Sequence, residues 1–390
     1  MILVPGFLTL FVFFALRAIS PDGWRFTWLG NASRAVNGAL AALLLFVVLM
    51  TGMPLRVEQS PYLEAFGPQP TLEKLAGEFR NTPFRVAMVG LHPAQAQAAG
   101  LETFGGSFVL VNRYYKDYAG LVVAPQFRDS EKEERFRNYW YHLLMSEWDV
   151  HPRFTAYVPS SITAADWNLD LLAAANVRYI IAGDPVPGLE IFETSPPQPQ
   201  YIAETRKEDS VGPVFVYALP NLLPRGYLTP RIEVLENRAA VLARLTSASP
   251  SDLATTAFLT QEDADGLDAA LFNEQTRSCG EIISSDYGPD QLVFEVSTQA
   301  PCMLIVSNNV DPKWRATING EPISLLRVNH AFMGLRLSQP GEHRVELVFD
   351  DPRFPAVLAA VPLGALVIVL APLAGGVNRR RKRASEMDKS

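Results

Sequence analysis

The sequence lacks the motifs that most catalytic and metal sites require. It contains five histidines and two cysteines, and no histidine lies in an HxH or HExxH pattern. A metal site needs several such ligands at suitable spacing, so none is expected. There is also no GxSxG motif for an activated nucleophile, no P-loop and no GxGxxG motif. We therefore expect no cofactor and assign no catalytic residue.

Paired carboxylates, which glycoside hydrolysis requires, are the remaining generic candidates. The pairs in the sequence are Asp166 with Asp170, Asp263 with Asp265, and Asp350 with Asp351. Each is explained more simply as a helix start, a turn or a solvated sheet edge. A hydrolase working alone remains an alternative only if one acidic pair converges in a cleft.

Basic residues are scarce outside two short segments. The loop at 17–34 and the tail at 378–390 are both net positive, whereas the chain as a whole has a formal charge of −7. The net charge of residues 55–354 is therefore more negative than that of the whole chain. Binding to nucleic acid requires clustered Lys and Arg, so we expect no nucleic-acid partner.

Long apolar runs are present at both ends of the chain. Residues 35–54 and 355–377 carry no charge and have the length of membrane-spanning helices. The run at 1–17 is shorter, and we interpret it as a third span. The alternative is a cleaved signal peptide, although the run lacks a basic leading region and a small-residue cleavage site. The lipid bilayer is thus an expected partner.

The basic residues beside these runs predict their orientation. Lys and Arg collect on the cytoplasmic side of membrane proteins, and here they collect in the loop at 17–34 and the tail at 378–390. Residues 55–354 should then face the other side of a bacterial cytoplasmic membrane.

The outer segment predicts an α/β unit followed by an all-β domain. In the unit at 72–199, apolar strands at 84–90 and 177–183 alternate with helical patterns, one of them at 130–148. Residues 200–275 form an α+β connecting region that contains a helix at about 236–247.

The last outer segment, 276–352, reads as a β-sandwich. Asn319-Gly320 lies between two alternating runs and is a strong hairpin signal. Pro340-Gly341 supplies a further turn, and short strands with regularly spaced turns are typical of a sandwich.

Two cysteines and several aromatic residues leave alternatives open. Cys279 and Cys302 each precede a predicted strand, and they form either a disulfide or two buried thiols, because sequence does not give their separation. The candidate glycan contacts are Tyr114, Tyr115, Trp140, Trp314 and Asn329. For the aromatic residues, packing in the core or at the membrane interface is favoured over stacking on sugar rings.

A family resemblance is carried by the C-terminal stretch SNNVDPKWRATINGEPISLLRVNHAFMGLRLSQPGEHRVELVFDDP, residues 307–352. It resembles the closing domain of the YfhO-like bacterial membrane proteins. The matching residues are Trp314, Ala316, Asn319, Gly320, Asn329, Phe332, Gly334, Gly341, His343 and Pro352. Upstream, AGLETFGGSFVLVNRYY and LDLLAAANVRYIIAG are also similar to family segments, so the resemblance covers roughly residues 79–377.

The resemblance implies membership of a class of multi-span glycosyltransferases that use lipid-linked sugar donors. Those enzymes have many more spans, and their acidic catalytic residue lies in an outer loop near the N-terminus that has no counterpart here. We therefore expect a non-catalytic, membrane-anchored outer domain that acts in envelope glycan or glycolipid assembly. Its expected partner is a glycan or lipid-linked sugar. Two origins stay open: a truncated product of a longer glycosyltransferase gene, or one half of a split enzyme that works with a separate multi-span catalytic subunit. The alternative is an envelope interaction module without sugar chemistry.

Overall fold

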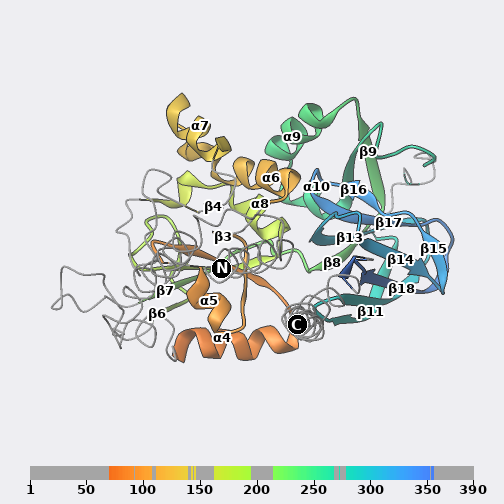
Figure 1. Ribbon diagram of the computed structural model, residues 1–390, viewed down its shortest axis with the longest axis horizontal. Helices are drawn as coiled ribbons and strands as arrows, with labels where there is room; N and C mark the ends of the chain where they lie inside the picture. Colours follow the sequence, from red (N-terminus) through yellow and green to blue (C-terminus); the bar gives the residue numbers. More distant parts are fainter. Residues whose placement is uncertain are drawn as a thin grey trace, which may run out of the picture. The chain divides into compact units, whose positions relative to one another are not determined.

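The computed structural model describes most of the outer segment. The described residues are 70–91, 93–107, 111–138, 142–143, 145, 162–194, 214–267, 272, 278–351 and 353–354. The described residues up to Asp350 belong to one compact unit, Gln59–Asp350. This unit is mixed α/β, contains several sheets and consists mostly of strands (Figure 1).

The expected membrane spans at 1–17, 35–54 and 355–377 lie outside the described residues, as does the tail at 378–390. None of the helices in the described ranges has the length and apolar character that a membrane crossing needs.

The first sheet has five strands in the order β2-β1-β5-β7-β6. The strands are β1 (Arg85–Val89), β2 (Glu102–Thr103), β5 (Val177–Ala182), β6 (Glu193–Thr194) and β7 (Phe215–Ala218). β1 pairs in parallel with β2 and β5, whereas β7 pairs antiparallel with β5 and β6. The strands expected at 84–90 and 177–183 are confirmed as β1 and β5, and the structure shows that they pair with each other.

Helices cover both faces of this sheet, which explains why β1 is buried at every position. Val86 and Met88 pack with α4 (Pro70–Asn81) and α5 (Ala94–Ala98) on one face. Ala87 and Val89, on the opposite face, belong to the core of α6 (Arg113–Val123) and α8 (Leu169–Ala174). Figure 1 shows these two pairs of helices on opposite sides of the strands.

The expected helix at 130–148 is too long. Helix α7 spans Ser130–Asn138, and the short strand β4 (His142–Leu143) then pairs with β3 (Gly106–Ser107). The missing side chain of Gly105 leaves room for the Leu143 carbonyl, where a Cβ would clash. Leu143 is therefore apolar because it lies in a buried strand. Its position in the helical spacing of apolar residues is a coincidence.

A βαβ unit follows the first sheet. The parallel strands β9 (Arg231–Leu235) and β10 (Thr256–Thr260) are joined through α9 (Arg238–Ser247) and α10 (Pro250–Thr255). The Asn237 side chain caps α9 by accepting a hydrogen bond from Ala240 N. This confirms the helix expected at about 236–247.

The C-terminal part contains two antiparallel sheets. The five-stranded sheet has the order β11-β12-β18-β14-β15, and the four-stranded sheet has the order β16-β17-β13-β8. The strands of the first are β11 (Gly280–Tyr287), β12 (Gln291–Thr298), β14 (Trp314–Ile318), β15 (Glu321–Ile323) and β18 (Gly341–Phe349). The strands of the second are β8 (Gly226–Thr229), β13 (Cys302–Asn309), β16 (Leu326–Val328) and β17 (Phe332–Leu337).

Side chains of both sheets share one hydrophobic core, for example Phe294 of β12 and Leu335 of β17. The expected hairpin is confirmed: β14 and β15 pair antiparallel, and Asn319 and Gly320 have φ of 53° and 85°. The segment 200–275, expected to be a connecting region, contributes one strand to a sheet of each neighbouring part. β7 enters the first sheet, and β8 pairs with β13.

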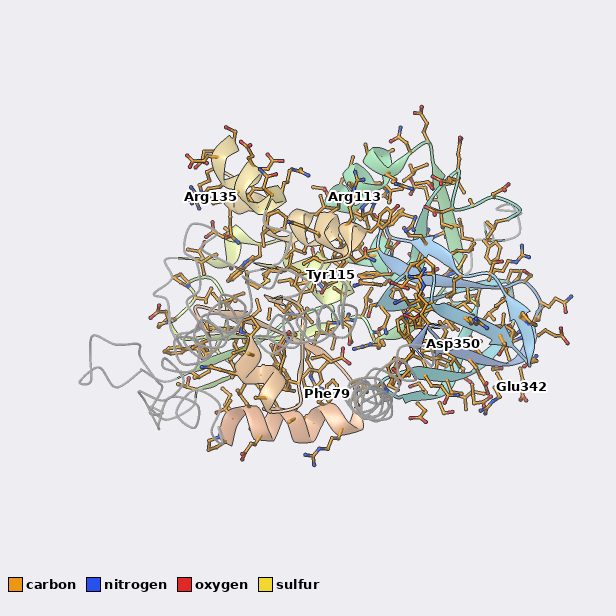
Figure 2. All side chains as sticks on the ribbon, viewed as in Figure 1. Phe79, Arg113, Tyr115, Arg135, Glu342 and Asp350 are labelled. Carbon is orange, nitrogen blue, oxygen red and sulfur yellow. A yellow bond between two sulfur atoms is a disulfide. The ribbon has the colours of Figure 1, made fainter. Side chains whose placement is uncertain are left out.

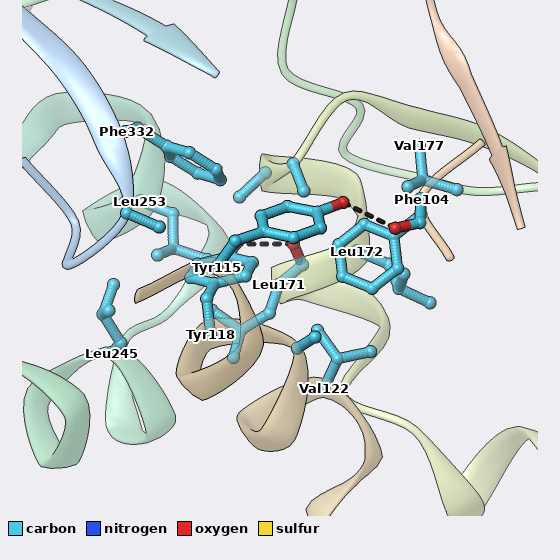
Figure 3. Close-up of a cluster of buried hydrophobic side chains, with 14 of the residues drawn as sticks. Phe104, Tyr115, Tyr118, Val122, Leu171, Leu172, Val177, Leu245, Leu253 and Phe332 are labelled. Carbon is cyan, nitrogen blue, oxygen red and sulfur yellow. Dashed lines mark hydrogen bonds between the residues drawn. The ribbon is translucent and has the colours of Figure 1, made fainter. Parts of the chain in front are cut away.

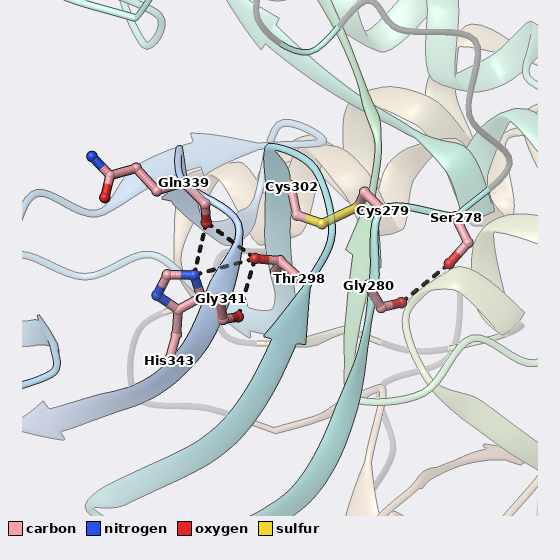
Figure 4. The surroundings of a disulfide bond; sticks show 8 residues. All are labelled: Ser278, Cys279, Gly280, Thr298, Cys302, Gln339, Gly341 and His343. Atoms are coloured by element: carbon pink, nitrogen blue, oxygen red, sulfur yellow. Dashed lines mark hydrogen bonds between the residues drawn. A yellow bond between two sulfur atoms is a disulfide. The ribbon is translucent and has the colours of Figure 1, made fainter.

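Cys279 and Cys302 form a disulfide, with their Cα atoms 5.7 Å apart (Figure 4). Cys279 directly precedes β11, and Cys302 begins β13, so the bond joins the two sheets that share the core. Both cysteines are almost completely buried. The two ends of the intervening hairpin segment are thereby fixed to one another.

We expect Gly280→Ala to lower the free energy of unfolding by about 1–3 kcal/mol, the range for forced overpacking. A Cβ at Gly280 would clash with the backbone carbonyl of Ser297 on the neighbouring strand. Urea denaturation of the purified chain measures the change.

Gly77→Ala is the matched control. Gly77 lies in α4 with nothing within 4 Å of its added Cβ, so alanine should stabilise the helix by about 0.5–1 kcal/mol. Equal effects of the two substitutions would contradict the close strand contact at Gly280.

Candidate functional site

The structure brings two of the five sequence candidates, Tyr114 and Asn329, to the same region. The Tyr114 ring centroid lies 5.5 Å from that of His330, the residue after Asn329. Trp140 lies outside the described residues. Tyr115 and Trp314 lie elsewhere, Tyr115 in the interior and Trp314 on the five-stranded sheet.

The start of α6 determines where the tyrosines point. The Asn112 side chain accepts hydrogen bonds from Tyr114 N and Tyr115 N, and so caps the helix. From this start, Tyr115 and Tyr118 lie one helical turn apart and both enter the core (Figure 3). Tyr115 is buried, whereas Arg113 on the same helix is exposed (both are labelled in Figure 2).

Tyr115 is a packed core residue. Its side chain is 7% exposed, and its hydroxyl donates a 2.6 Å hydrogen bond to the Phe104 carbonyl. Burial raises the pKa of Tyr115 to about 12, so the phenol stays protonated at neutral pH. Tyr118 likewise donates to the Leu171 carbonyl over 2.7 Å. Neither ring offers a face to a sugar.

Tyr114 is held by arginines. The Arg327 guanidinium lies 3.8 Å from the Tyr114 ring centroid, and that of Arg238 lies 4.9 Å from it. Arg327 is itself fixed, because it donates a 3.2 Å hydrogen bond to Asp263. These cation–π contacts stabilise the ring, and they occupy positions that a stacked sugar would need.

Asn329 and His330 form a strained turn between β16 and β17. Their φ angles are 49° and 67°, in the left-handed region that non-glycine residues rarely adopt. Asn329 exchanges hydrogen bonds with Phe258, through its backbone N–H and through its side-chain oxygen. His330 Nε2 lies 3.2 Å from Asp117 Oδ2 on α6. The strain is thus sustained by β10 and α6, and Asn329, 1% exposed, is structural.

Trp314 packs on the five-stranded sheet. Its ring meets Phe349 of β18 edge-to-face, with centroids 5.4 Å apart, and it lies against the core shared by the two sheets. It is partly buried, so packing explains its position without a ligand.

One carboxylate of each candidate pair has structural partners. Asp166 accepts hydrogen bonds from the backbone and hydroxyl of Thr163 and pairs with Arg128 at 2.6 Å. Asp263 binds Arg327 and the Thr260 hydroxyl. Asp350 pairs with Arg315 at 3.3 Å. Within the described ranges, no group of three or more His, Cys, Asp or Glu side chains could hold a metal ion.

Sequence reasoning missed a polar cluster formed by Arg85, Arg225 and Glu102. Arg85 and Arg225 are 8% and 7% exposed, and both guanidinium groups approach the same Glu102 carboxylate, at 3.8 and 2.6 Å. A signal was present in the sequence: Arg85 begins an otherwise apolar strand, FRVAMVG. Buried arginines are rare unless they are paired.

No protein-family model matches the chain, and no curated protein or solved structure is significantly similar to it. The YfhO-like resemblance of residues 79–377 therefore stays a prediction.

We expect Trp314→Ala to lower the free energy of unfolding by about 3 kcal/mol, the lower end of the range for buried aromatic residues. The ring is partly exposed and loses its contact with Phe349. Urea denaturation tests stability, and a glycan-binding assay on the folded variant tests the alternative role. Unchanged stability with lost sugar binding would contradict the packing role.

Asp166 should contribute to stability above acidic pH. Burial alone would raise its pKa, but the hydrogen bonds from Thr163 and the pairing with Arg128 outweigh burial and hold the pKa below the ordinary value. Its contribution is therefore complete above the unfolded pKa, about 3.9, and is lost as the pH falls through the lower folded pKa.

Asp166→Asn should accordingly flatten the fall in unfolding free energy below about pH 4. Chemical denaturation at a series of pH values measures this slope. A variant curve that stays parallel to the wild-type curve through this window would contradict the assignment.

Proposed function

We propose that this chain is a membrane-anchored extracytoplasmic protein of the YfhO-like glycosyltransferase class that acts in bacterial envelope glycan or glycolipid assembly without catalysing the reaction itself. Its apolar segments at 1–17, 35–54 and 355–377 would anchor it in the cytoplasmic membrane. An α/β unit followed by a β-sandwich would face outward. A separate multi-span subunit would supply the chemistry.

The disulfide between Cys279 and Cys302 is the observation that carries the outward placement. Disulfides form and persist in oxidising compartments and are rare in the cytosol. The orientation derived from the basic loop at 17–34 and the tail at 378–390 agrees with it. Both arguments are independent of the family resemblance.

The non-catalytic role is supported by how the candidate groups are used. Asp166 and Asp263 serve as caps and ion-pair partners, and Tyr114 and Tyr115 are held by arginines or by the core. An acid–base pair for sugar chemistry needs carboxyl groups that can reach a substrate. These are engaged elsewhere.

The alternative of an interaction module without sugar chemistry is favoured by one feature. Ile191 and Phe192 are 50% and 54% exposed, and they precede the edge strand β6 of the first sheet. Neighbouring exposed apolar residues of this kind suit a protein partner. Purification from native membranes separates the two functions, because a sugar-free module should be recovered without a glycosyltransferase subunit.

The outward placement predicts the redox state of the cysteines in cells. Cells are quenched in acid, the protein is denatured, and thiols are alkylated with a polymer-linked maleimide that shifts the band on a gel. Because both cysteines are bonded in an oxidising compartment, we expect no shift without reductant and a double adduct after reduction.

Cys302→Ser is the control and should give a single adduct in both lanes. The variant should also lose about 3 kcal/mol of stability, because the bond closes a loop with a sequence separation of 23 residues. A double adduct without reductant in the wild type would place the outer segment in a reducing compartment and contradict the proposal.

A further inference from the structure

Arg85 lies at the start of the central strand β1, where its guanidinium is surrounded by protein. Nη1 donates hydrogen bonds to the Ala175 carbonyl at 2.7 Å and to Ser307 Oγ at 3.3 Å. Ala175 ends α8, and Ser307 belongs to β13. The side chain therefore extends from the first sheet to the four-stranded sheet.

Arg225 approaches the same place from the residue before β8. Its Nε donates to Asn308 Oδ1 at 2.9 Å, and its carbonyl accepts a hydrogen bond from Ser307 N at 2.8 Å. Two guanidinium groups thus converge on the end of β13. The Ala175 carbonyl, Ser307 and Asn308 are neutral, so these partners position the two guanidinium groups without balancing their charge.

Glu102 supplies the acidic partner. It belongs to the two-residue edge strand β2, directly opposite Arg85 in the register with β1. Glu102 Oε2 lies 2.6 Å from Arg225 Nη1 and 3.8 Å from Arg85 Nε. Unlike the arginines, its side chain is 42% exposed. Solvent therefore reaches the Glu102 side chain, whereas the two arginines are buried.

The cluster contains more positive than negative charge. Among the described residues, Glu102 is the only carboxylate that acts on Arg85, whereas Arg225 opposes its charge. Burial, and then Arg225, lower the pKa of Arg85. Two buried cations that share one carboxylate are costly. Glu102 lies 3.8 Å from Arg85 Nε, too far for a hydrogen bond, so an oxyanion that contacts both guanidinium groups closely would lower that cost.

We propose that Arg85 and Arg225 form an oxyanion-binding site, in which the phosphate or carboxylate group of a ligand takes the position that the Glu102 carboxylate holds in this structure. Paired guanidinium groups suit such a ligand, because their planar donors match the oxygen atoms of carboxylate and phosphate. Glu102 is then an internal competitor that moves toward solvent when the ligand binds.

This site is independent of the proposed membrane function. It depends only on contacts within the unit Gln59–Asp350. Purified chain is enough to test it, so failure of the membrane placement would leave the site standing, and failure of the site would leave the placement standing.

Glu102→Gln is the direct test, because it removes the competing charge and keeps the side-chain shape. Inorganic phosphate and acetate are titrated separately at constant ionic strength, and binding is followed by calorimetry and by the shift in Tm. We expect Glu102→Gln to bind at least one of the two anions about tenfold more tightly than the wild type, since loss of a charge-assisted competitor is worth that much.

Glu295→Gln is the matched control. Glu295 is 38% exposed and pairs with Arg344 at 2.7 Å, which closely resembles the pairing of Glu102 with Arg225. Arg344, however, is exposed and also binds Glu346. The control variant should therefore bind anions no better than the wild type.

The two anions identify the ligand chemistry. Tighter phosphate binding alone indicates a phosphate-bearing ligand, and tighter acetate binding alone indicates a carboxylate. If Glu102→Gln binds neither anion more tightly than the wild type and Glu295→Gln, the proposal is wrong. Arg225→Lys added to Glu102→Gln should remove most of the gain, with circular dichroism as the check on folding. A folded double variant that keeps the full gain would also overturn it.

Discussion

The described structure depends on the contacts that the first two turns of α6 make with α8 and with the C-terminal sheets. Tyr118 donates to the Leu171 carbonyl on α8, and its ring lies 4.8 Å from Phe332 of β17, so one side chain joins the first sheet's helices to the C-terminal sheets. The helix cap Asn112 also donates to the Val310 carbonyl, and Asp117 meets His330. Because these contacts lie within a few residues of one helix, moving α6 would disturb both parts together.

The same contact region contains a buried polar residue, Arg85, whose role is to orient the parts of the fold that it connects. Buried ion pairs usually add little stability, since desolvation offsets their attraction. Arg85 could be replaced by an apolar residue if it only filled space. It instead bonds to α8 and β13 at once, which fixes the direction in which the two parts meet. Buried arginines of this kind contribute a fixed orientation more than they contribute stability. A fixed orientation of the guanidinium donors is also what the recognition of an anion requires.

The sequence predicts those parts of the fold that depend on interactions between residues close together in the chain. The Asn319-Gly320 turn and the capped helix α9 follow from backbone preferences of a few residues, and both were predictable. The helix expected at 130–148 was not, because Leu143 is buried by pairing with Gly106, which lies far away in the chain. The site followed the same rule: Tyr114 and Asn329 were named as candidates, but only the tertiary contacts reveal that Arg327 and Phe258 already engage them.

A strained turn at Asn329 and His330 persists because its neighbours over-determine it. Asn329 satisfies both polar backbone groups of Phe258, donating from its own backbone N–H and accepting with its side-chain oxygen. An apolar side chain at this position would leave the buried Phe258 N–H unpaired. The turn is therefore tied to β10 through Phe258 and to α6 through Asp117. A turn fixed from two sides in this way holds an unchanging geometry, which agrees with the binding role proposed above.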